Sequence, residues 1–271
     1  MKPSHASRWA VLVGCLSLVA TALYGQALPA QKPFEPTVGQ AGKDVVWVPT
    51  SHALVEKMLD LAKVTPQDYV IDLGSGDGRT VIAAAKRGAR ALGIEYNPEM
   101  VELSRRNAAE AHVGDRASFA QADLFESDFS QATVITMFLL PDINLRLRPK
   151  ILDLRPGTRV VSNSFTMEEW QADESATVEG DCSSWCTAYF WIVPAKVDGA
   201  WKTAQGTLTI TQQFQHFSGT LGSTTLTGGH LRGDSIKFTV GPAHYTGRVN
   251  GSSMQGSVAG GPNGTWTATR Q

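Results

Sequence analysis

One stretch of the sequence combines residue types that bind small charged ligands: VIDLGSGDGRT, residues 70–80. An apolar run comes first, three glycines follow at Gly74, Gly76 and Gly78, and an alanine-rich run that favours helix begins at Thr80. Glycine lets the backbone turn sharply and approach a ligand closely, and a helix N-terminus directs backbone N–H groups toward it. Strand, glycine loop and helix in this order predict a site for a nucleotide-like ligand.

A second chemical feature is Glu95, which ends the next predicted strand 21 residues after Gly74. From that position a carboxylate can hydrogen-bond both hydroxyls of a ribose. A dinucleotide fingerprint needs a glycine where Arg79 stands, and a Walker-type loop needs a lysine that this loop lacks. Asp72 and Asp77 would repel a pyrophosphate, but they suit a ligand with an ammonium, a sulfonium and a ribose. S-adenosylmethionine carries all three groups.

The glycine loop resembles motif I of class I methyltransferases, whose methyl donor is S-adenosylmethionine. The resemblance implies that Glu95 binds the ribose, that Asp123 faces the exocyclic amine of the adenine, and that segment 137–142 borders the methyl group and the acceptor. The cofactor-binding residues that it implies are Asp72, Gly74, Ser75, Gly76, Gly78, Glu95, Asn97, Asp123 and Leu124. The residues that it implies for positioning the acceptor are Phe138, Leu139 and Pro141.

A wider likeness covers residues 46–171 and includes Val48-Pro49-Thr50 and the segment 157–162. It is similar to the family of the mitochondrial lysine methyltransferases that act on the adenine nucleotide translocase and the ATP synthase c-subunit, with its bacterial relatives. The resemblance implies methyl transfer to a nucleophilic acceptor, for which a protein lysine amine is the leading candidate. The apolar residues 138–141 could keep such an amine neutral by desolvation, and they lack the Asn/Asp-Pro-Pro-Tyr pattern of nucleobase amine methyltransferases.

Simpler structural interpretations stand beside several of these roles. Asp123 can cap the following turn, and Pro141 can merely end the fourth strand. Arg146, Arg148 and Lys150 are more typical of a solvated helix face than of a patch for an acidic substrate. The alternative function is an exported, non-catalytic binding protein that uses a degenerate methyltransferase scaffold and a β-rich tail.

Helical and strand patterns alternate along the first two thirds of the chain. Helices are predicted over 51–63, 80–86, 98–111 and 145–152, and strands over 69–73, 91–95, 117–120, 132–140, 158–164 and 187–193, the last as an antiparallel edge strand. This alternation predicts an α/β fold, a Rossmann-like, seven-stranded, mostly parallel sheet with helices on both faces. The methyltransferase domain is expected to span 46–197.

The composition changes after residue 198. Of the 26 glycines in the chain, 13 lie between Gly206 and Gly264, and apolar residues there alternate with polar ones. Asn250-Gly251 and Asn263-Gly264 predict tight hairpin turns, although both also fit the glycosylation acceptor pattern. Residues 198–271 are therefore predicted to form an antiparallel β-rich extension, a meander or a partial barrel.

Three histidines in this tail, His216, His230 and His244, recur at intervals of 14 residues. A hairpin-sized unit repeated in an antiparallel meander explains the spacing. A metal site made from all three is the less favoured alternative, because equivalent strand positions meet only in a suitable register. We predict no metal centre.

The N-terminus has the pattern of an export signal. Two basic residues precede an apolar run from Trp9 to Tyr24, and small residues permit cleavage after Ala27. Residues 1–27 are predicted to be a signal peptide, and 28–45, rich in proline and glycine, an extended linker. The protein is accordingly expected to be periplasmic or secreted; an uncleaved membrane anchor is the weaker alternative, because the run is short for a span.

Removal of the signal would leave two cysteines, Cys182 and Cys186. An even pair in an exported chain predicts a disulfide, and two cysteines alone make a poor zinc site.

A formal charge of −1 without a basic stripe argues against an extended nucleic acid as partner, so a protein substrate is the expected partner. Export conflicts with the use of S-adenosylmethionine, because this methyl donor is made in the cytosol and an exported enzyme has no evident supply of it.

Overall fold

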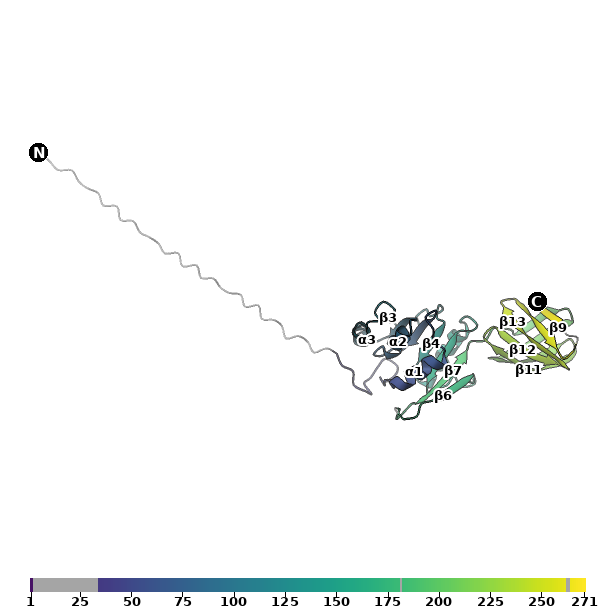
Figure 1. Cartoon of the computed structure of the whole chain (residues 1–271), viewed down its shortest axis with the longest axis horizontal. Coiled ribbons are helices and arrows are strands. Elements are labelled where there is room, and N and C mark those ends of the chain that lie inside the picture. The colour runs from purple at the N-terminus through teal and green to yellow at the C-terminus, as the bar shows by residue number, and fades with distance from the viewer. Residues whose placement is uncertain (2–33, 181, 262–263) are drawn as a thin grey trace. The chain divides into compact units, whose positions relative to one another are not determined.

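The computed structural model describes residues 34–180, 182–261 and 264–271, together with Met1. Residues 2–27 of the predicted signal peptide, residues 28–33 of the predicted linker and Asn263 lie outside the described residues. From residue 34 onward the chain forms an α/β sheet structure followed by a closed β-barrel (Figure 1). The helices of this described part are all too short or too polar to cross a membrane.

The α/β part is built on one seven-stranded sheet in the order β3-β2-β1-β4-β5-β7-β6. Strands β1 to β5 run parallel, and β7 is antiparallel to both of its neighbours. The strands are β1 (Tyr69–Leu73), β2 (Arg90–Glu95), β3 (Ala117–Gln121), β4 (Val134–Met137), β5 (Arg159–Asn163), β6 (Glu174–Thr177) and β7 (Thr187–Ile192). The predicted Rossmann-like fold with a mostly parallel sheet is confirmed.

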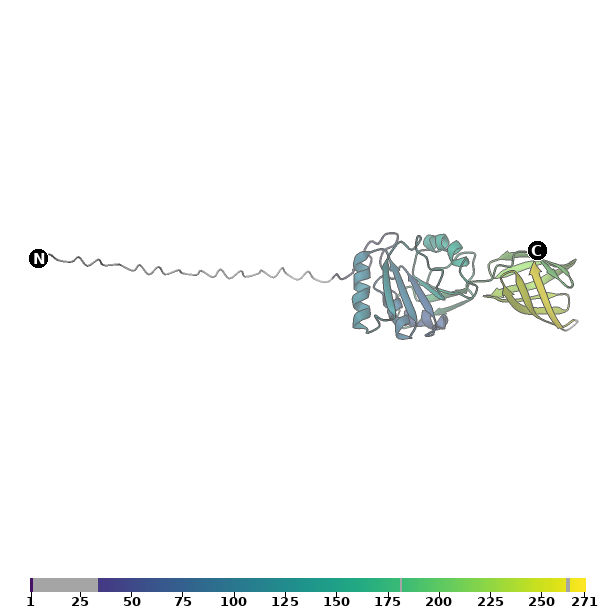
Figure 2. The same ribbon diagram turned by 90° about the horizontal axis from the view of Figure 1, so that it is seen from above.

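Helices cover both faces of this sheet, as Figure 2 shows. They are α1 (His52–Leu61), α2 (Arg79–Lys86), α3 (Pro98–Glu110) and α4 (Pro141–Leu152). The first three pack their apolar residues into one core with Val70, whereas α4 packs into a second core with Ile71. Val70 and Ile71 follow each other on β1, so their side chains point to opposite faces of the sheet. Apolar residues on both faces of a strand are what a sheet covered on both faces requires, and Asp72 is the charged exception in β1.

The strand order reverses between β1 and β4. The chain leaves β1 through α2 toward β2 and β3, and it leaves β4 through α4 toward β5 on the other side. Leu73 and Met137, the last residues of the two strands, are register partners. Connections that diverge from adjacent carboxyl ends leave a crevice there, and ligands of open α/β sheets bind in that crevice.

Most boundaries differ from the prediction by only one or two residues, and three larger differences are informative, two of them next to Pro141. Strand β4 ends at Met137 instead of residue 140, and α4 begins at Pro141 instead of residue 145. Proline fits the first position of a helix because its missing N–H would be unpaired there. Pro141 therefore opens a helix and does not merely end a strand.

The third difference concerns the edge of the sheet. Strand β7 was expected at the edge, but β6 pairs along its outer side from Glu174↔Phe190 to Thr177↔Thr187. Strand β6 has the sequence ESAT and is mostly exposed, so it lacks the apolar alternation that marks a strand in a sequence.

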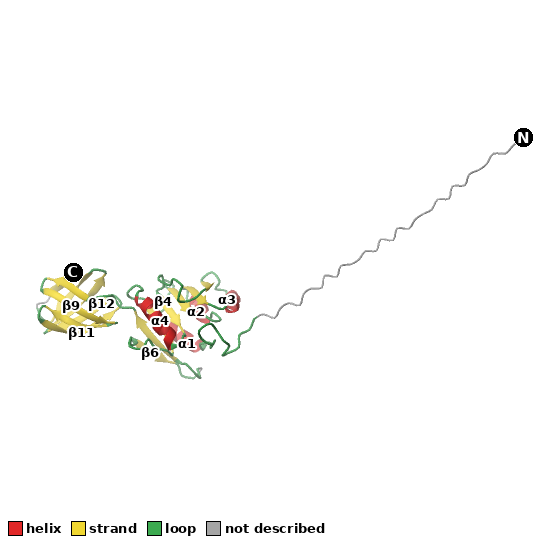
Figure 3. Ribbon diagram, turned by 180° about the vertical axis from the view of Figure 1, so that it is seen from behind, coloured by secondary structure: helices red, strands yellow, loops and turns green. Residues whose placement is uncertain are grey.

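The C-terminal part forms a closed antiparallel barrel in which every strand has two neighbours (Figure 3). Its strands are β8 (Gly199–Thr203), β9 (Gly206–Gln213), β10 (His216–Leu221), β11 (Thr224–Arg232), β12 (Ser235–Val240), β13 (Ala243–Asn250), β14 (Ser253–Ala259) and β15 (Gly264–Arg270). Buried aromatic side chains, among them Trp201, Phe238 and Trp266, fill its interior. The predicted β-rich extension is confirmed, and its closure goes beyond the partial barrel that the sequence predicts.

The histidine repeat follows the barrel strands without bringing all three rings together. His216 and His230 are register partners on β10 and β11, with ring centroids 5.2 Å apart. Strand β12 separates them from β13, where His244 Nδ1 lies 3.0 Å from Thr239 Oγ1. The described residues contain no group of three side chains placed to hold a metal ion.

Candidate functional site

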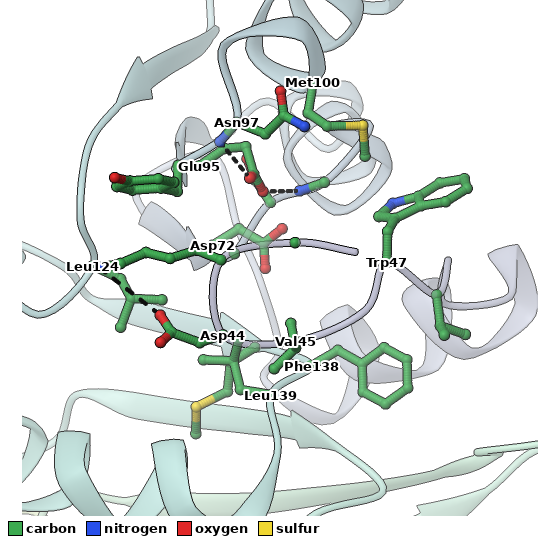
Figure 4. Close-up of a pocket in the computed structure, with 18 of the residues that line it drawn as sticks. Asp44, Val45, Trp47, Asp72, Glu95, Asn97, Met100, Leu124, Phe138 and Leu139 are labelled. Carbon is green, nitrogen blue, oxygen red and sulfur yellow. Dashed lines mark hydrogen bonds and ion pairs between the residues drawn. The ribbon is translucent and has the colours of Figure 1, made fainter. Parts of the chain in front are cut away.

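A cavity opens at the carboxyl ends of β1 and β4 (Figure 4). Five segments supply most of its lining: the glycine loop after β1, the end of β2, the loop after β3, the residues after β4, and the segment 40–50 that precedes α1. The cavity therefore lies where the reversal of strand order predicts a ligand.

The glycine loop needs glycine at its key positions. Gly74, Gly76 and Gly78 have φ values of +75°, +54° and +81°. A Cβ on Gly76 would lie 2.8 Å from Trp47 Nε1, and a Cβ on Gly78 would lie 2.8 Å from the ring of Phe119. Left-handed backbone and lack of space both exclude larger residues here.

Helix α3 holds the loop in place from the side. The Ser104 hydroxyl donates to the Gly76 carbonyl at 2.8 Å, and Asn107 Nδ2 donates to the Asp77 carbonyl at 2.9 Å. These two hydrogen bonds from α3 hold the backbone of the loop in its observed conformation.

Glu95 is fixed by two backbone groups at the floor of the cavity. Its Oε2 accepts a hydrogen bond from the Gly76 N–H at 2.9 Å, and its Oε1 accepts one from the Asn97 N–H at 2.9 Å (Figure 4). Each carboxylate oxygen can accept more than one hydrogen bond, so acceptor capacity remains for ligand hydroxyls. Asn97 also caps α3, since its Oδ1 accepts from the Glu99 N–H at 2.9 Å.

Asp72 is the buried acid of the site, with 6% of its surface exposed. Burial raises its pKa to about 7, the negative charges of Glu95 and Asp77 add to the rise, and a 2.6 Å hydrogen bond from the Thr136 hydroxyl opposes it. Its hydrogen-bonding partner is thus an uncharged hydroxyl. A positively charged group in the cavity would favour the ionised form.

Asp77 has a different role from the one its place in the loop suggests. Arg79 holds its carboxylate in a fork, with Nη2–Oδ2 at 2.6 Å and Nε–Oδ1 at 2.9 Å. The same guanidinium donates to the Thr50 carbonyl at 2.7 Å. Because Arg79 compensates Asp77, the negative charge that the loop region offers a ligand comes from Asp72 and Glu95.

Asp123 has two partners in the structure. Its Oδ1 accepts a hydrogen bond from the Phe125 N–H at 2.9 Å, so the capping interpretation describes one of its contacts. Its other oxygen pairs with Lys43, whose Nζ also lies 4.7 Å from the ring centroid of Tyr96. The hydrogen bond from Lys43 and the one from Phe125 hold the pKa of Asp123 below its usual value.

Lys43 belongs to a short hairpin in a segment that was expected to be an extended linker. Ala41 and Val46 form an antiparallel bridge, the Gly39 N–H donates to the Trp47 carbonyl at 2.8 Å, and the Trp47 N–H donates to the Gln40 carbonyl at 2.9 Å. Residues 40–50 line the cavity, so the end of the predicted linker is part of the site.

Most of the residues that the sequence singles out lie at this cavity, and two do not. The lining includes Asp72, Gly74, Ser75, Gly76, Glu95, Asn97, Asp123, Leu124, Phe138 and Leu139. Gly78 caps the N-terminus of α2, and Pro141 is the first residue of α4; neither belongs to the lining. The Ser75 hydroxyl is buried, with its oxygen 2.5 Å from where a Cβ on Gly93 would lie.

Sequence reasoning missed many lining residues, among them four aromatic ones and a lysine: Trp47, Tyr96, Phe165, Trp185 and Lys43. Tyr96 directly follows Glu95, so its place next to the acid was available from the sequence. Phe165 and Trp185 reach the cavity from beyond β5 and from the β6–β7 connection. Their convergence depends on strand pairing that the sequence does not reveal.

The predicted disulfide is present between Cys182 and Cys186, with a Cα–Cα distance of 5.7 Å. It lies in the connection between β6 and β7, next to Trp185. The covalent bond therefore constrains a loop that contributes to the cavity.

Arg148 and Lys150 serve the structure of α4 and its surroundings. Arg148 donates to the Met167 carbonyl at 2.8 Å and pairs with Glu169, and Lys150 donates to the Phe125 carbonyl at 3.0 Å. These contacts favour the structural interpretation of the basic face over a patch for an acidic substrate.

Comparison with known proteins places this sheet and cavity in a family. Residues 72–174 match the model of the ANTKMT methyltransferase domain. The chain is 43% identical over 152 residues to a protein-lysine N-methyltransferase of Saccharolobus islandicus, a span of 55% of this chain and 94% of that protein. It is 33% identical over 181 residues to the ATP synthase c-subunit lysine N-methyltransferase of Homo sapiens, a span of 66% of this chain and 75% of that protein.

A solved structure supports the same assignment. The RNA methyltransferase from Salinibacter ruber in complex with S-adenosyl-L-homocysteine is 48% identical, with a TM-score of 0.52, and the match covers 55% of this chain and 96% of that one. The family match begins at Asp72 and includes Glu95, Asp123 and Phe138. Fold, cavity and sequence identity together show that this chain is an S-adenosylmethionine-dependent methyltransferase and belongs to the family of the ANTKMT methyltransferase domain.

Proposed function

We propose that this enzyme transfers the methyl group of S-adenosylmethionine to the side-chain amine of a lysine in a protein. The observation that carries the proposal is the 43% identity to a protein-lysine N-methyltransferase, which extends over 94% of that protein. The human relative, a lysine N-methyltransferase of the ATP synthase c-subunit, supports it at 33% identity. An apolar wall beside the acidic floor of the cavity gives the proposal a physical basis in this chain.

The cavity residues fit the donor. Gly74 and Gly76 leave the backbone of the loop open to close approach, and the fixed carboxylate of Glu95 can accept hydrogen bonds from ribose hydroxyls. Asp72, buried beside an uncharged hydroxyl, complements a positively charged ligand. Asp123 and Leu124 lie on the loop after β3, where they would meet the adenine.

When bound, S-adenosylmethionine supplies a methyl group activated by a sulfonium. The lysine amine must reach it unprotonated; its lone pair forms the N–C bond as the C–S bond breaks, and the electron pair of that bond stays on sulfur. Leu139 and Leu140, which follow Phe138 after β4, give the cavity an apolar wall. An apolar wall disfavours the charged ammonium and so promotes the neutral nucleophile, while the cavity supplies orientation.

Substitution of Glu95 tests the cofactor site. Glu95→Gln keeps one oxygen acceptor and the size of the side chain but removes the charge. A lost hydrogen bond to a charged group costs about 1.5–3 kcal/mol, so Kd for S-adenosylmethionine should rise about tenfold or more in calorimetric titration. Glu110→Gln, at an exposed position at the end of α3, is the matched control and should leave Kd unchanged. A folded wild-type protein that does not bind the donor would refute the proposal.

The raised pKa of Asp72 predicts a pH-dependent affinity. In the free protein the carboxyl is protonated below about pH 7, whereas a cationic ligand favours the ionised form. The affinity for S-adenosylmethionine should therefore fall from pH 8 to pH 6, by up to about tenfold per pH unit. Titration of the ligand itself changes the affinities of wild type and Asp72→Asn equally, so the ratio of the two affinities reports on Asp72 alone. A ratio that does not change with pH would contradict the role of Asp72 in binding the cationic donor.

The same pKa predicts how stability depends on pH. The folded pKa of Asp72 lies above the ordinary value of 3.8, so the folded state binds more protons between these values and stability is lost as the pH rises through this window. Asp72→Asn should therefore gain stability relative to wild type between pH 5 and pH 8 in urea denaturation without ligand. A constant difference between the two proteins would contradict the raised pKa.

The lysine acceptor can be tested against RNA, the acceptor that the name of the Salinibacter ruber enzyme gives. Tritium-labelled S-adenosylmethionine is incubated with the enzyme and either a nuclease-treated protein extract or a protease-treated RNA extract. We expect label in the protein fraction, recovered as methylated lysine after acid hydrolysis, and loss of label with Glu95→Gln. Label confined to the RNA would overturn the lysine proposal and leave the methyltransferase assignment intact.

We also propose that the protein is exported. Residues 1–27 have the composition of a signal peptide, and the disulfide between Cys182 and Cys186 is typical of an oxidising compartment. Expression of the full chain in a bacterial host should give a periplasmic or secreted product whose N-terminal sequence begins at Leu28. An intact N-terminus in a membrane fraction would instead indicate an uncleaved anchor, and a cytosolic full-length product would refute export.

A further inference from the structure

Three aromatic rings meet on one side of the cavity. Phe138 follows β4, Phe165 follows β5, and Trp185 comes from the connection between β6 and β7. The rings of Phe138 and Phe165 are stacked with centroids 6.0 Å apart, and the centroids of Phe138 and Trp185 are 6.1 Å apart. All three residues line the cavity, on elements other than those that supply Asp72 and Glu95. We call these three residues the aromatic wall.

Trp185 is the unusual member of the aromatic wall. It is 48% exposed, although large aromatic side chains are mostly buried unless they bind something. Its backbone has a left-handed φ of +54°, a conformation that residues other than glycine seldom adopt. Packing in a core does not account for this exposed residue, which lines the adjoining cavity.

The disulfide holds Trp185 at the cavity. Cys186 follows Trp185 directly and is bonded to Cys182, which closes a loop of five residues. Just beyond this loop the Val178 N–H donates to the Cys186 carbonyl at 2.9 Å, and Thr177 pairs with Thr187 at the end of the β6–β7 ladder. The loop is thus anchored to the sheet on one side and closed covalently on the other.

The charges around the aromatic wall favour a cation. The two cations in the cavity lining of the described residues, Lys43 and Arg79, are paired with Asp123 and Asp77. Glu95 supplies negative charge on the cofactor side, and Asp72 adds to it when it is ionised. An ammonium within about 6 Å of an aromatic face is attracted to it, and the methylene groups of a lysine side chain pack well against rings.

We propose that Phe138, Phe165 and Trp185 receive the alkylammonium side chain of the acceptor lysine, and that the Cys182–Cys186 disulfide is the positioning device that keeps Trp185 in this wall. The inference rests on the proposed lysine methyl transfer and assigns its acceptor subsite. The rings attract the lysine side chain as the ammonium that it carries in solution; the ammonium releases its proton before transfer, and the neutral amine reacts beside Leu139 and Leu140. The methylated product is again a cation and has more apolar surface, so the aromatic wall suits the product as well.

A binding experiment that needs no turnover tests the subsite. The full chain, saturated with S-adenosyl-L-homocysteine, is titrated with N-acetyl-trimethyllysine amide, a stable cationic mimic of the product, and the shifts are followed by NMR. The neutral analogue with a tert-butyl group in place of the trimethylammonium is the matched ligand. Wild type should bind the cationic probe about fivefold or more tightly than the neutral one. Equal binding of the two probes would overturn the cation-binding role.

Variants locate the effect. Trp185→Ala should weaken binding of the cationic probe about fivefold or more, Trp185→Phe should restore most of it, and Val38→Ala, an exposed apolar truncation outside the cavity lining, should have no effect. Calorimetry with S-adenosylmethionine should give an unchanged Kd for every variant. Wild-type affinity for the cationic probe in Trp185→Ala would refute the proposal.

The disulfide is tested separately. The double variant Cys182→Ser/Cys186→Ser should bind the cationic probe less tightly than wild type, and dithiothreitol should lower wild-type affinity to that level without affecting the double variant. Full affinity in the reduced protein would show that the disulfide does not position Trp185. The two proposals can fail separately. If wild type labels protein lysine but Trp185→Ala binds the cationic probe normally, the aromatic wall is rejected and the lysine methyltransferase function stands. If wild type binds the cationic probe selectively but labels no protein lysine, the lysine methyltransferase function is rejected instead.

Discussion

The whole catalytic half of this protein depends on the reversal of strand order between β1 and β4. Because the connections leave these neighbouring strands in opposite directions, no helix can cover their carboxyl ends, and a cavity remains above Leu73 and Met137. The glycine loop, Glu95 and the residues after β4 all reach this cavity because each follows a parallel strand of the same sheet. Polar groups that would be unfavourable in a hydrophobic core therefore lie together at the carboxyl ends of the parallel strands.

Within this cavity three carboxyl groups differ in their hydrogen-bonding partners. Asp77 is compensated by Arg79, and Glu95 is fixed by two backbone N–H groups, whereas Asp72 is buried beside a hydroxyl. Burial favours a neutral carboxyl at Asp72, which is why the pKa of this residue rises to about 7. The three carboxylates of one cavity thus have different partners: a guanidinium holds Asp77, backbone N–H groups hold Glu95, and a hydroxyl donates to Asp72.

The sequence was sufficient for the parts of the site that local rules determine. The glycine loop and Glu95 follow from the strand–loop–helix pattern, and the sheet follows from the alternation of apolar runs. The position of Trp185 does not, because it depends on β6, a short polar strand, pairing with β7. Nor does the hairpin around Lys43, whose glycines and prolines are equally typical of a linker. Pairing of β6 with β7 decides the position of Trp185, and packing of Trp47 against Gly76 decides that of the hairpin.

Closure of the C-terminal barrel has a consequence for the order in which the molecule is made. Its first strand pairs with its last, from Trp201↔Arg270 to Thr203↔Ala268. The barrel therefore cannot close until synthesis has reached the C-terminus, whereas every strand of the methyltransferase sheet precedes residue 193. In a nascent chain the catalytic half is complete while the barrel is still open.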